Sequence, residues 1–293
     1  MSNRTSTVRA YVAWAAVCVL WGTTYLAIRI ALETVPPLLM GALRWPLAGA
    51  AILTMLRLRG QRLPPPRDWG SLAIVGVLLI GVGNGGVVWA ERTLPSGLTA
   101  LLVAAIPFWM VGVERLAGDR SAMAPARVFG LFVGFSGIVL LVWPELEIGR
   151  GGRDTAIGVV ATQVACLGWA IGSSYSRRRG ASENVLAAAA FQMLFGGLAM
   201  LAAGAARGEL PYLALNARTA GAIVYLLVFG SVIGFSAYAF ALKHLPVATV
   251  SLYAYVNPVI AVALGTIVLG EPLSPRLAVA GAVVLLGVVL VRR

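Results

Sequence analysis

Two stretches of the sequence decide how the chain is organised: residues 94–107 read LPSGLTALLVAAIP, and residues 245–258 read LPVATVSLYAYVNP. Both begin with Leu-Pro and end with proline, so Pro107 and Pro258 match at an offset of 151 residues without any gap. Apolar residues match by chance in any hydrophobic chain, but two pairs of aligned prolines are harder to explain in that way. We therefore expect an internal repeat.

The composition indicates which solvent surrounds this repeat. Of the 293 residues, 59% are hydrophobic and only 12% are charged, with a mean hydropathy of +0.88, whereas about 25% of residues are charged in an ordinary soluble protein. A chain this apolar could not bury all of its hydrophobic surface away from water, so most of it must be surrounded by lipid. Each crossing of a bilayer takes about 20 residues. The sequence predicts an all-α polytopic membrane protein with ten transmembrane helices, over residues 11–32, 38–56, 69–91, 95–114, 124–143, 156–176, 184–206, 217–241, 246–269 and 275–291.

The repeat divides these helices into two sets of five. We assign residues 1–145 to the first five-helix repeat and residues 155–293 to the second. Because five crossings are an odd number, the second copy must enter the membrane from the opposite side, which is the inverted-repeat arrangement of many secondary transporters. Trp21 and Trp169, which match at an offset of 148, are then equivalent residues on helices 1 and 6.

The positive charges predict the orientation and the partners. Fifteen of the 23 Lys and Arg residues fall on the side that bears the N-terminus and six on the other, and cytoplasmic loops carry the excess of positive charge. Both termini are therefore predicted to be cytoplasmic, in a multi-pass protein of the inner membrane surrounded by the lipid bilayer. The net charge of +12 is spread over short runs rather than one face, so we expect no nucleic-acid partner. The oligomeric state stays open, a monomer being the simplest interpretation.

Groups that could carry catalysis or hold a cofactor are scarce. His244 is the only histidine and follows Lys243 at a helix end, while Cys18 and Cys166 lie in apolar segments at no paired or metal-binding spacing. The glycines of residues 81–86 lack the strand-turn-helix context of a nucleotide-binding loop. They favour close helix packing, with a flexible segment beside a cavity as the alternative. We predict no enzyme, no cofactor and no metal site.

Four motifs stand in a recognisable order: WGTTY at 21–25, RWPLAG at 44–49, LPSGLTAL at 94–101 and LGEPL at 269–273. Their order and spacing resemble the drug/metabolite transporter (DMT) superfamily and, within it, the EamA family. The resemblance covers nearly the whole chain and implies ten helices in two inverted repeats that export small metabolites. Exporters of aromatic amino acids and drugs of the YddG type are similar. No particular substrate is implied, because members of the family differ widely.

Polar and aromatic residues near mid-membrane indicate the substrate path, because polar groups are expensive in hydrocarbon. Asn84 and Asn257 lie near the middle of helices 3 and 9. For Trp21 and Trp169, core packing and ligand contact are both reasonable, and their equivalence in the repeat favours a cavity lined by helices 1, 3, 4, 6, 8 and 9. The predicted substrate-binding residues are Trp21, Tyr25, Asn84, Trp169, Ser173, Phe235, Tyr238, Tyr253 and Asn257. Pro107 and Pro258 are expected to kink helices 4 and 9 beside them.

Two charged residues, Arg44 and Glu91, bear on how the substrate is recognised and on whether transport is coupled to protons. Arg44 lies roughly 4 to 5 Å from the middle of helix 2, counting 1.5 Å per residue. Arg44 either stabilises the fold by hydrogen bonds to backbone carbonyls or helix ends, or attracts the carboxylate of an amino-acid substrate. We favour the first interpretation, in which Arg44 is a structural charge. No carboxylate lies at mid-membrane, which favours substrate moving down its own gradient without an obligatory proton. Glu91, at the outer end of helix 3, is the strongest objection, because a small shift of that boundary would draw it inward.

The sequence as a whole predicts an inner-membrane transporter that exports small metabolites by alternating access. Amino acids, including aromatic or other hydrophobic ones, and related amphipathic compounds are the preferred small-molecule substrates. The alternative is a nucleotide-sugar or lipid-linked-sugar carrier of the same superfamily. A membrane-embedded enzyme is less favoured, because no nucleophile and base lie at a usable spacing. The exact substrate, the direction of transport and the coupling to protons are left open.

Overall fold

The computed structural model describes residues 2–118, 125–142, 152–179, 184–245, 247–250 and 252–291, and within them the chain is helical without strands. Pro246 and the segment 143–151, which holds the predicted boundary between the repeats, lie outside the described residues. Seven described spans are long and apolar enough to cross a membrane, and three shorter apolar helices accompany them. The prediction of an all-α polytopic protein with ten apolar spans is therefore confirmed.

The elements follow one another as a series of long helices with short connections. Those of the first half are α1 (Ser2–Ala31), α2 (Pro37–Leu58), α3 (Pro66–Gly76), η1 (Val77–Asn84), α4 (Gly85–Ala90), α5 (Ser96–Val103), α6 (Ile106–Leu116) and α7 (Pro125–Val142). Those of the second half are α8 (Gly152–Arg179), α9 (Val185–Ala206), the short 3-10 turn η4 (Leu210–Tyr212), α10 (Ala217–Tyr225), η5 (Leu226–Ile233), α11 (Gly234–His244), α12 (Val247–Val250), α13 (Tyr253–Leu269) and α14 (Pro275–Val291).

Several predicted spans differ from the observed helices. The first helix begins at Ser2 rather than at residue 11, because a helix does not stop where its apolar residues stop. The fourth span, predicted as one helix over 95–114, is interrupted at Ala104 and Ala105 between α5 and α6. Pro107 lies in the first turn of α6, where its missing N–H leaves no hydrogen bond unmade. In the ninth span α12 and α13 are separate elements, and Pro258 lies inside α13.

Two π-helical segments occupy equivalent places in the two halves. The π segments η1 (Val77–Asn84) and η5 (Leu226–Ile233) are both eight residues long, and their starts and ends are each 149 positions apart. Gly81 of η1 and Gly230 of η5 match at this same offset of 149. Short π-helical insertions are uncommon and often mark functional sites. The third and eighth spans therefore share a backbone irregularity that hydrophobic periodicity does not predict.

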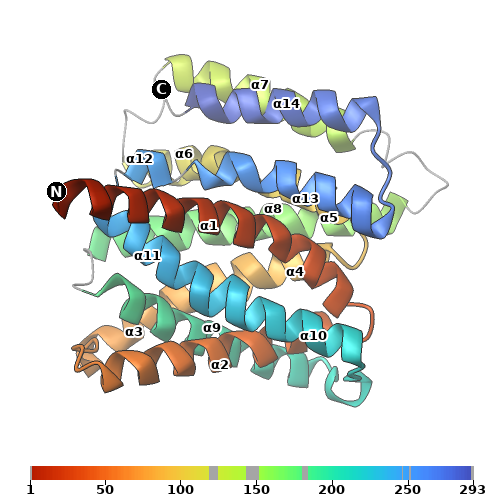
Figure 1. Cartoon of the computed structure of the whole chain (residues 1–293). Coiled ribbons are helices and arrows are strands. Elements are labelled where there is room, and N and C mark those ends of the chain that lie inside the picture. The colour runs from red at the N-terminus through yellow and green to blue at the C-terminus, as the bar shows by residue number, and fades with distance from the viewer. Residues whose placement is uncertain are drawn as a thin grey trace.

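Glycines allow the helices to approach closely, as is usual where lipid provides no hydrophobic driving force between them. A Cβ on Gly49 of α2 would lie 2.5 Å from the carbonyl oxygen of Ala190 on α9, and a Cβ on Gly287 of α14 would lie 2.3 Å from the Cα of Gly134 on α7. Figure 1 shows both pairs, with α7 beside α14 at one edge of the bundle and α2 beside α9 at the other. The remaining spans lie between these two pairs.

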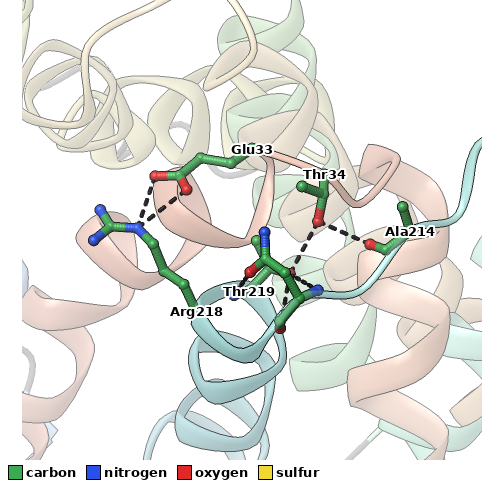
Figure 2. Close-up of polar contacts among 6 residues, drawn as sticks. Glu33, Thr34, Ala214, Arg218 and Thr219 are labelled. Atoms are coloured by element: carbon green, nitrogen blue, oxygen red, sulfur yellow. Dashed lines mark hydrogen bonds and ion pairs between the residues drawn. The ribbon is translucent and has the colours of Figure 1, made fainter.

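Polar contacts tie the end of α1 to the start of α10, as Figure 2 shows. Arg218 donates from Nε to Glu33 at 3.1 Å, and the Thr34 hydroxyl donates to the Ala214 carbonyl at 2.8 Å and lies within hydrogen-bond distance, 2.9 Å, of the Thr219 hydroxyl. Asn216 caps α10 in the same place. At the opposite end of the bundle Glu114 of α6 pairs with Arg177 and Arg178 of α8. Each cluster joins a helix of the first half to a helix of the second.

Candidate functional site

A cavity of about 200 Å³ lies between the two halves of the chain. It is smaller than the roughly 300–1,000 Å³ of sites that hold drug-sized ligands, which favours a small solute. Seven helical spans contribute to its wall, and most of the side chains are apolar or aromatic. The lining residues are Trp21, Thr24, Tyr25, Ile28, Arg44, Trp45, Gly83, Asn84, Val87, Ala100, Val103, Ala104, Ile106, Pro107, Ala165, Cys166, Trp169, Phe235, Tyr253, Ala254, Asn257 and Pro258.

Trp21 organises the aromatic part of the wall. Its ring centroid lies 4.9 Å from that of Tyr253, in an edge-on arrangement, and 5.1 Å from that of Phe235. Its indole N–H donates to the carbonyl oxygen of Gly230 at 3.1 Å. Edge-to-face and offset rings at these separations are favourable beyond the area that they bury. The indole is therefore held in one orientation by residues of the second half.

Trp21 and Trp169 pack in the same manner on opposite halves of the molecule. A Cβ on Gly234, which follows the π segment η5, would lie 2.7 Å from Nε1 of Trp21. A Cβ on Gly83, within the π segment η1, would lie 3.2 Å from Cε3 of Trp169. Each tryptophan thus rests on the π-containing span of the other half, where the absence of a side chain leaves room for the ring.

Among the described residues, Arg44 is the one charged side chain in the wall of the cavity, and only 3% of its surface is exposed. Its Nε donates to the Ser231 hydroxyl at 2.8 Å, and its guanidinium carbon lies 4.0 Å from the ring centroid of Trp45. Ser231 in turn donates to the Leu226 carbonyl at 3.1 Å. Among the described residues no carboxylate pairs with Arg44. Since α2 contributes both Arg44 and Trp45, helix 2 joins the predicted helices 1, 3, 4, 6, 8 and 9 in the wall of the cavity.

Two amides are among the neutral polar groups of the wall. Asn84 ends the π segment η1 and lines the cavity. In the orientation that satisfies its hydrogen bonds, the Asn257 amide nitrogen donates to the carbonyl oxygens of Cys18, at 3.1 Å, and Tyr253, at 3.0 Å. Because its nitrogen is engaged in this way, Asn257 leaves its side-chain oxygen as an acceptor. The cavity therefore combines one cation with amide groups in an aromatic setting.

The structure brings together most, though not all, of the residues that the sequence singled out. Trp21, Tyr25, Asn84, Trp169, Phe235, Tyr253 and Asn257 line the cavity, as do Pro107 and Pro258. Two predicted residues do not. Ser173 lies beyond the wall on α8, one turn past Trp169, and Tyr238 lies behind Trp21, with ring centroids 5.2 Å apart. Spacing along a helix selects a face, but the cavity covers only part of that face.

Sequence reasoning missed several lining residues, of which Trp45 and Cys166 are the clearest. Trp45 lies next to Arg44 in the RWPLAG motif, and its ring faces Phe235 with centroids 6.0 Å apart. A tryptophan adjacent to a costly charge was a usable signal. Cys166 carried no such signal, because it is one small side chain in an apolar run. Among the described residues no group of three His, Cys, Asp or Glu side chains could hold a metal ion.

Comparison with known proteins is consistent across sequence and fold. The profile of the EamA-like transporter family matches twice, over residues 8–143 and 156–293. The uncharacterized inner membrane transporter YedA of Escherichia coli K12 is 36% identical over 94% of this chain and 88% of its own. The protein PecM of Dickeya dadantii is 27% identical over 89% of this chain and 84% of its own. A crystal structure at 23% identity covers 96% of this chain with a TM-score of 0.63, which is a likeness of fold.

Proposed function

The chain belongs to the EamA-like transporter family, and from that premise we propose that it exports small amphipathic carboxylates, amino acids before others, across the inner membrane. As a member of this family it is a multi-pass membrane transporter. Relatives such as YedA are named as inner membrane transporters, which supports the same location. The finer claims are the substrate class and the alternating-access mechanism, and each has its own support.

The substrate class is inferred from the burial of Arg44 without a carboxylate partner among the described residues. A guanidinium removed from water needs a counter-charge, because an unpaired buried charge is strongly destabilising. Arg44 has a serine hydroxyl and an indole face as partners, and no carboxylate among the described residues. Arg44 also lines the cavity. A substrate carboxylate would accept hydrogen bonds from the planar guanidinium and supply the missing charge.

The size and the walls of the cavity favour an amino acid over the alternatives. About 200 Å³ suits a small solute rather than a nucleotide-sugar or a lipid-linked sugar. The rings of Trp21, Phe235 and Tyr253 offer apolar surface to a hydrophobic side chain. The Asn257 oxygen offers an acceptor to a substrate ammonium group. These contacts match a zwitterion with an apolar side chain.

Alternating access is supported by the relation between the two halves. One family profile matches both halves, and π segments of equal length occur at equivalent positions in each. Trp21 and Trp169 pack across the interface in the same way. Two halves with an inverted relation would exchange conformations around a central site and so expose it to each side in turn.

Uptake into proteoliposomes tests the proposal directly. We expect L-phenylalanine and L-leucine to equilibrate with the lumen of vesicles that contain the purified protein, at rates well above those of protein-free vesicles. L-phenylalaninamide lacks the carboxylate and should be carried about tenfold less well, since a hydrogen bond to a charged group contributes about 1.5–3 kcal/mol. Uptake of a uridine-diphosphate sugar instead of amino acids would favour the nucleotide-sugar carrier, and a chemically altered product would indicate an enzyme.

A further inference from the structure

Glu91 is an unusual carboxyl group for its position. It follows α4 directly, none of its surface is exposed, and neither carboxylate oxygen has a hydrogen-bond partner. Other glutamates of the described chain are satisfied. Glu209 accepts from the backbone N–H groups of Leu38 and Leu39, and Glu271 accepts from the N–H and hydroxyl of Ser96. Glu91 is therefore buried without the contacts that normally make burial of an acid tolerable.

An ionised carboxylate in such a place is far less stable than a neutral one. Removing a charge from water without pairing it costs several kcal/mol, and the group instead takes its neutral form. Ala90 and Leu94, which flank Glu91 along the chain, belong to a buried apolar cluster with Leu98 and Leu101. Burial without a hydrogen-bond partner thus favours the protonated form of Glu91 in the conformation described.

The nearest cation engages a different part of the same residue. Arg29 of α1 donates from its guanidinium to the backbone carbonyl oxygen of Glu91. Among the described residues it forms no ion pair with any carboxylate. A guanidinium that is adjacent to a buried acid but not paired with it is ready to form an ion pair once that acid loses its proton.

The other titratable groups around Glu91 do not replace Arg29. Tyr25 of α1 and Glu271 before α14 lie near enough to Glu91 for electrostatic interaction, but neither is a cation. Arg92 lies 4.6 Å from the ring centroid of Trp89, and Arg44 of α2 is directed at Ser231. The sequences of α5 and η1 contain no titratable side chain. Arg29 is thus the cation placed to receive the carboxylate.

This pair lies immediately beyond the cavity. Val87, one turn before Glu91, and Ile28, the residue before Arg29, both line the cavity wall. Tyr25, one turn before Arg29 on α1, lines it as well. A change in the pairing of Arg29 with Glu91 would shift α1 against α4, and α1 carries the tryptophan and tyrosine that contact the substrate space.

We propose that Glu91 is the proton-binding site that couples solute export to proton entry. The inference rests on the proposed function. In one state the O–H bond of the Glu91 carboxyl is intact and Arg29 holds the backbone carbonyl. In the other, water reaches Glu91, the O–H bond breaks, the proton passes to that water, and the carboxylate pairs with Arg29. The pairing of Glu91 with Arg29 and the binding of the solute both act on α1. Binding of the proton and binding of the solute can therefore favour different states of the transporter. The proposal departs from the sequence-based preference for uncoupled movement at Glu91, the residue that was its strongest objection.

The transport test compares wild type with Glu91→Gln, which resembles the protonated acid in shape and charge. With L-phenylalanine as probe and the membrane potential clamped to zero, a pH difference of one unit should drive wild-type accumulation toward about tenfold for one proton per solute. Glu91→Gln should still equilibrate the probe at equal pH but should not accumulate it. Glu33→Gln, which alters a partly exposed acid of the same end, should accumulate like wild type. Wild-type accumulation by Glu91→Gln would overturn the inference.

A second measurement detects the proton on Glu91 directly and does not depend on a substrate or on transport activity. Infrared difference spectra of the purified wild-type protein at neutral pH should contain the carbonyl stretch of a protonated carboxylic acid, shifted in heavy water and lost at high pH. Glu91→Gln should lack this band, whereas Glu33→Gln should keep it. Absence of the band from wild type would overturn the assignment of the proton. If no compound of the uptake panel is carried, the proposed function fails, and the infrared band still decides whether Glu91 holds a proton.

Discussion

The two π segments have the same length and equivalent positions, yet they present different groups to the cavity. The π segment η1 ends in Asn84, whose amide lines the wall directly. The π segment η5 carries Ser231 and the Gly230 carbonyl, which hold Arg44 and Trp21 in place. The backbone thus repeats while the polar groups do not. Conformational exchange requires similar halves, whereas recognition of one end of a solute requires dissimilar side chains.

The largest effect is expected from removing the cation that η5 holds. In Arg44→Met, the half-saturating concentration of L-phenylalanine should rise about 100-fold, because loss of one member of a desolvated charge pair costs about 2–5 kcal/mol. The preference for L-phenylalanine over L-phenylalaninamide should disappear as well. Ser231→Ala leaves the guanidinium present and should cause a smaller rise. An unchanged half-saturating concentration in Arg44→Met would return Arg44 to a purely structural role.

The tryptophan that rests on η1 provides the next test. Trp169→Ala should reduce the rate of uptake about tenfold while the folded protein recovered from membranes changes less, because one side of the ring faces the cavity and large aromatic contacts dominate binding sites. Trp69→Ala is the matched control. Trp69 is 42% exposed, packs against Phe191 with the two rings tilted, and is not among the residues that line the cavity, so its loss should leave uptake nearly unchanged. Equal losses of uptake and of folded protein would place Trp169 in the core.

The glycines at equivalent positions of the π segments should respond differently to the same substitution. In Gly230→Ala the added methyl would lie 3.0 Å from both Nη2 of Arg44 and Cγ2 of Thr24, whereas in Gly81→Ala the nearest atoms are 3.8 Å away. Overpacking of this kind costs about 1–3 kcal/mol. We expect L-phenylalanine uptake to fall several-fold in Gly230→Ala and less than about twofold in Gly81→Ala. Similar effects at both positions would remove the distinction drawn between the segments.

The smallest effect on transport, but a decisive result for symmetry, is expected from cysteine labelling. Gln61 and Tyr212 are exposed and each precedes one of the two π-containing spans, while the native Cys18 and Cys166 are buried. In intact cells an impermeant thiol reagent should label Tyr212→Cys but not Gln61→Cys, since the inverted arrangement and the positive-inside rule put them on opposite faces. Both variants should retain uptake. Labelling of both from one side would contradict the inverted repeat.

The features that periodicity encodes were predicted well, and those that depend on backbone detail were not. Apolar length located ten spans, and the family match agrees with the resemblance drawn from the RWPLAG and LGEPL motifs. Neither π segment was predicted, because a π insertion alters the hydrogen-bond register without altering the hydrophobic pattern. The interruption at Ala104 and Ala105 was expected only as a kink near Pro107. Proline marks where a helix deviates, but neighbouring helices decide by how much.

The sequence by itself determined the solvent, the number of spans, the repeat and most of the aromatic and amide residues of the cavity. These follow from composition and from spacing within single helices, which are local properties. Only the tertiary structure decided that Arg44 lines the cavity with no acid paired to it among the described residues, that Glu91 is sealed from solvent beside Arg29, and that Ser173 and Tyr238 lie off the wall. The physical reason is that burial and pairing depend on how each helix rotates against helices distant in sequence, and that rotation is set by close packing at glycines such as Gly83 and Gly234.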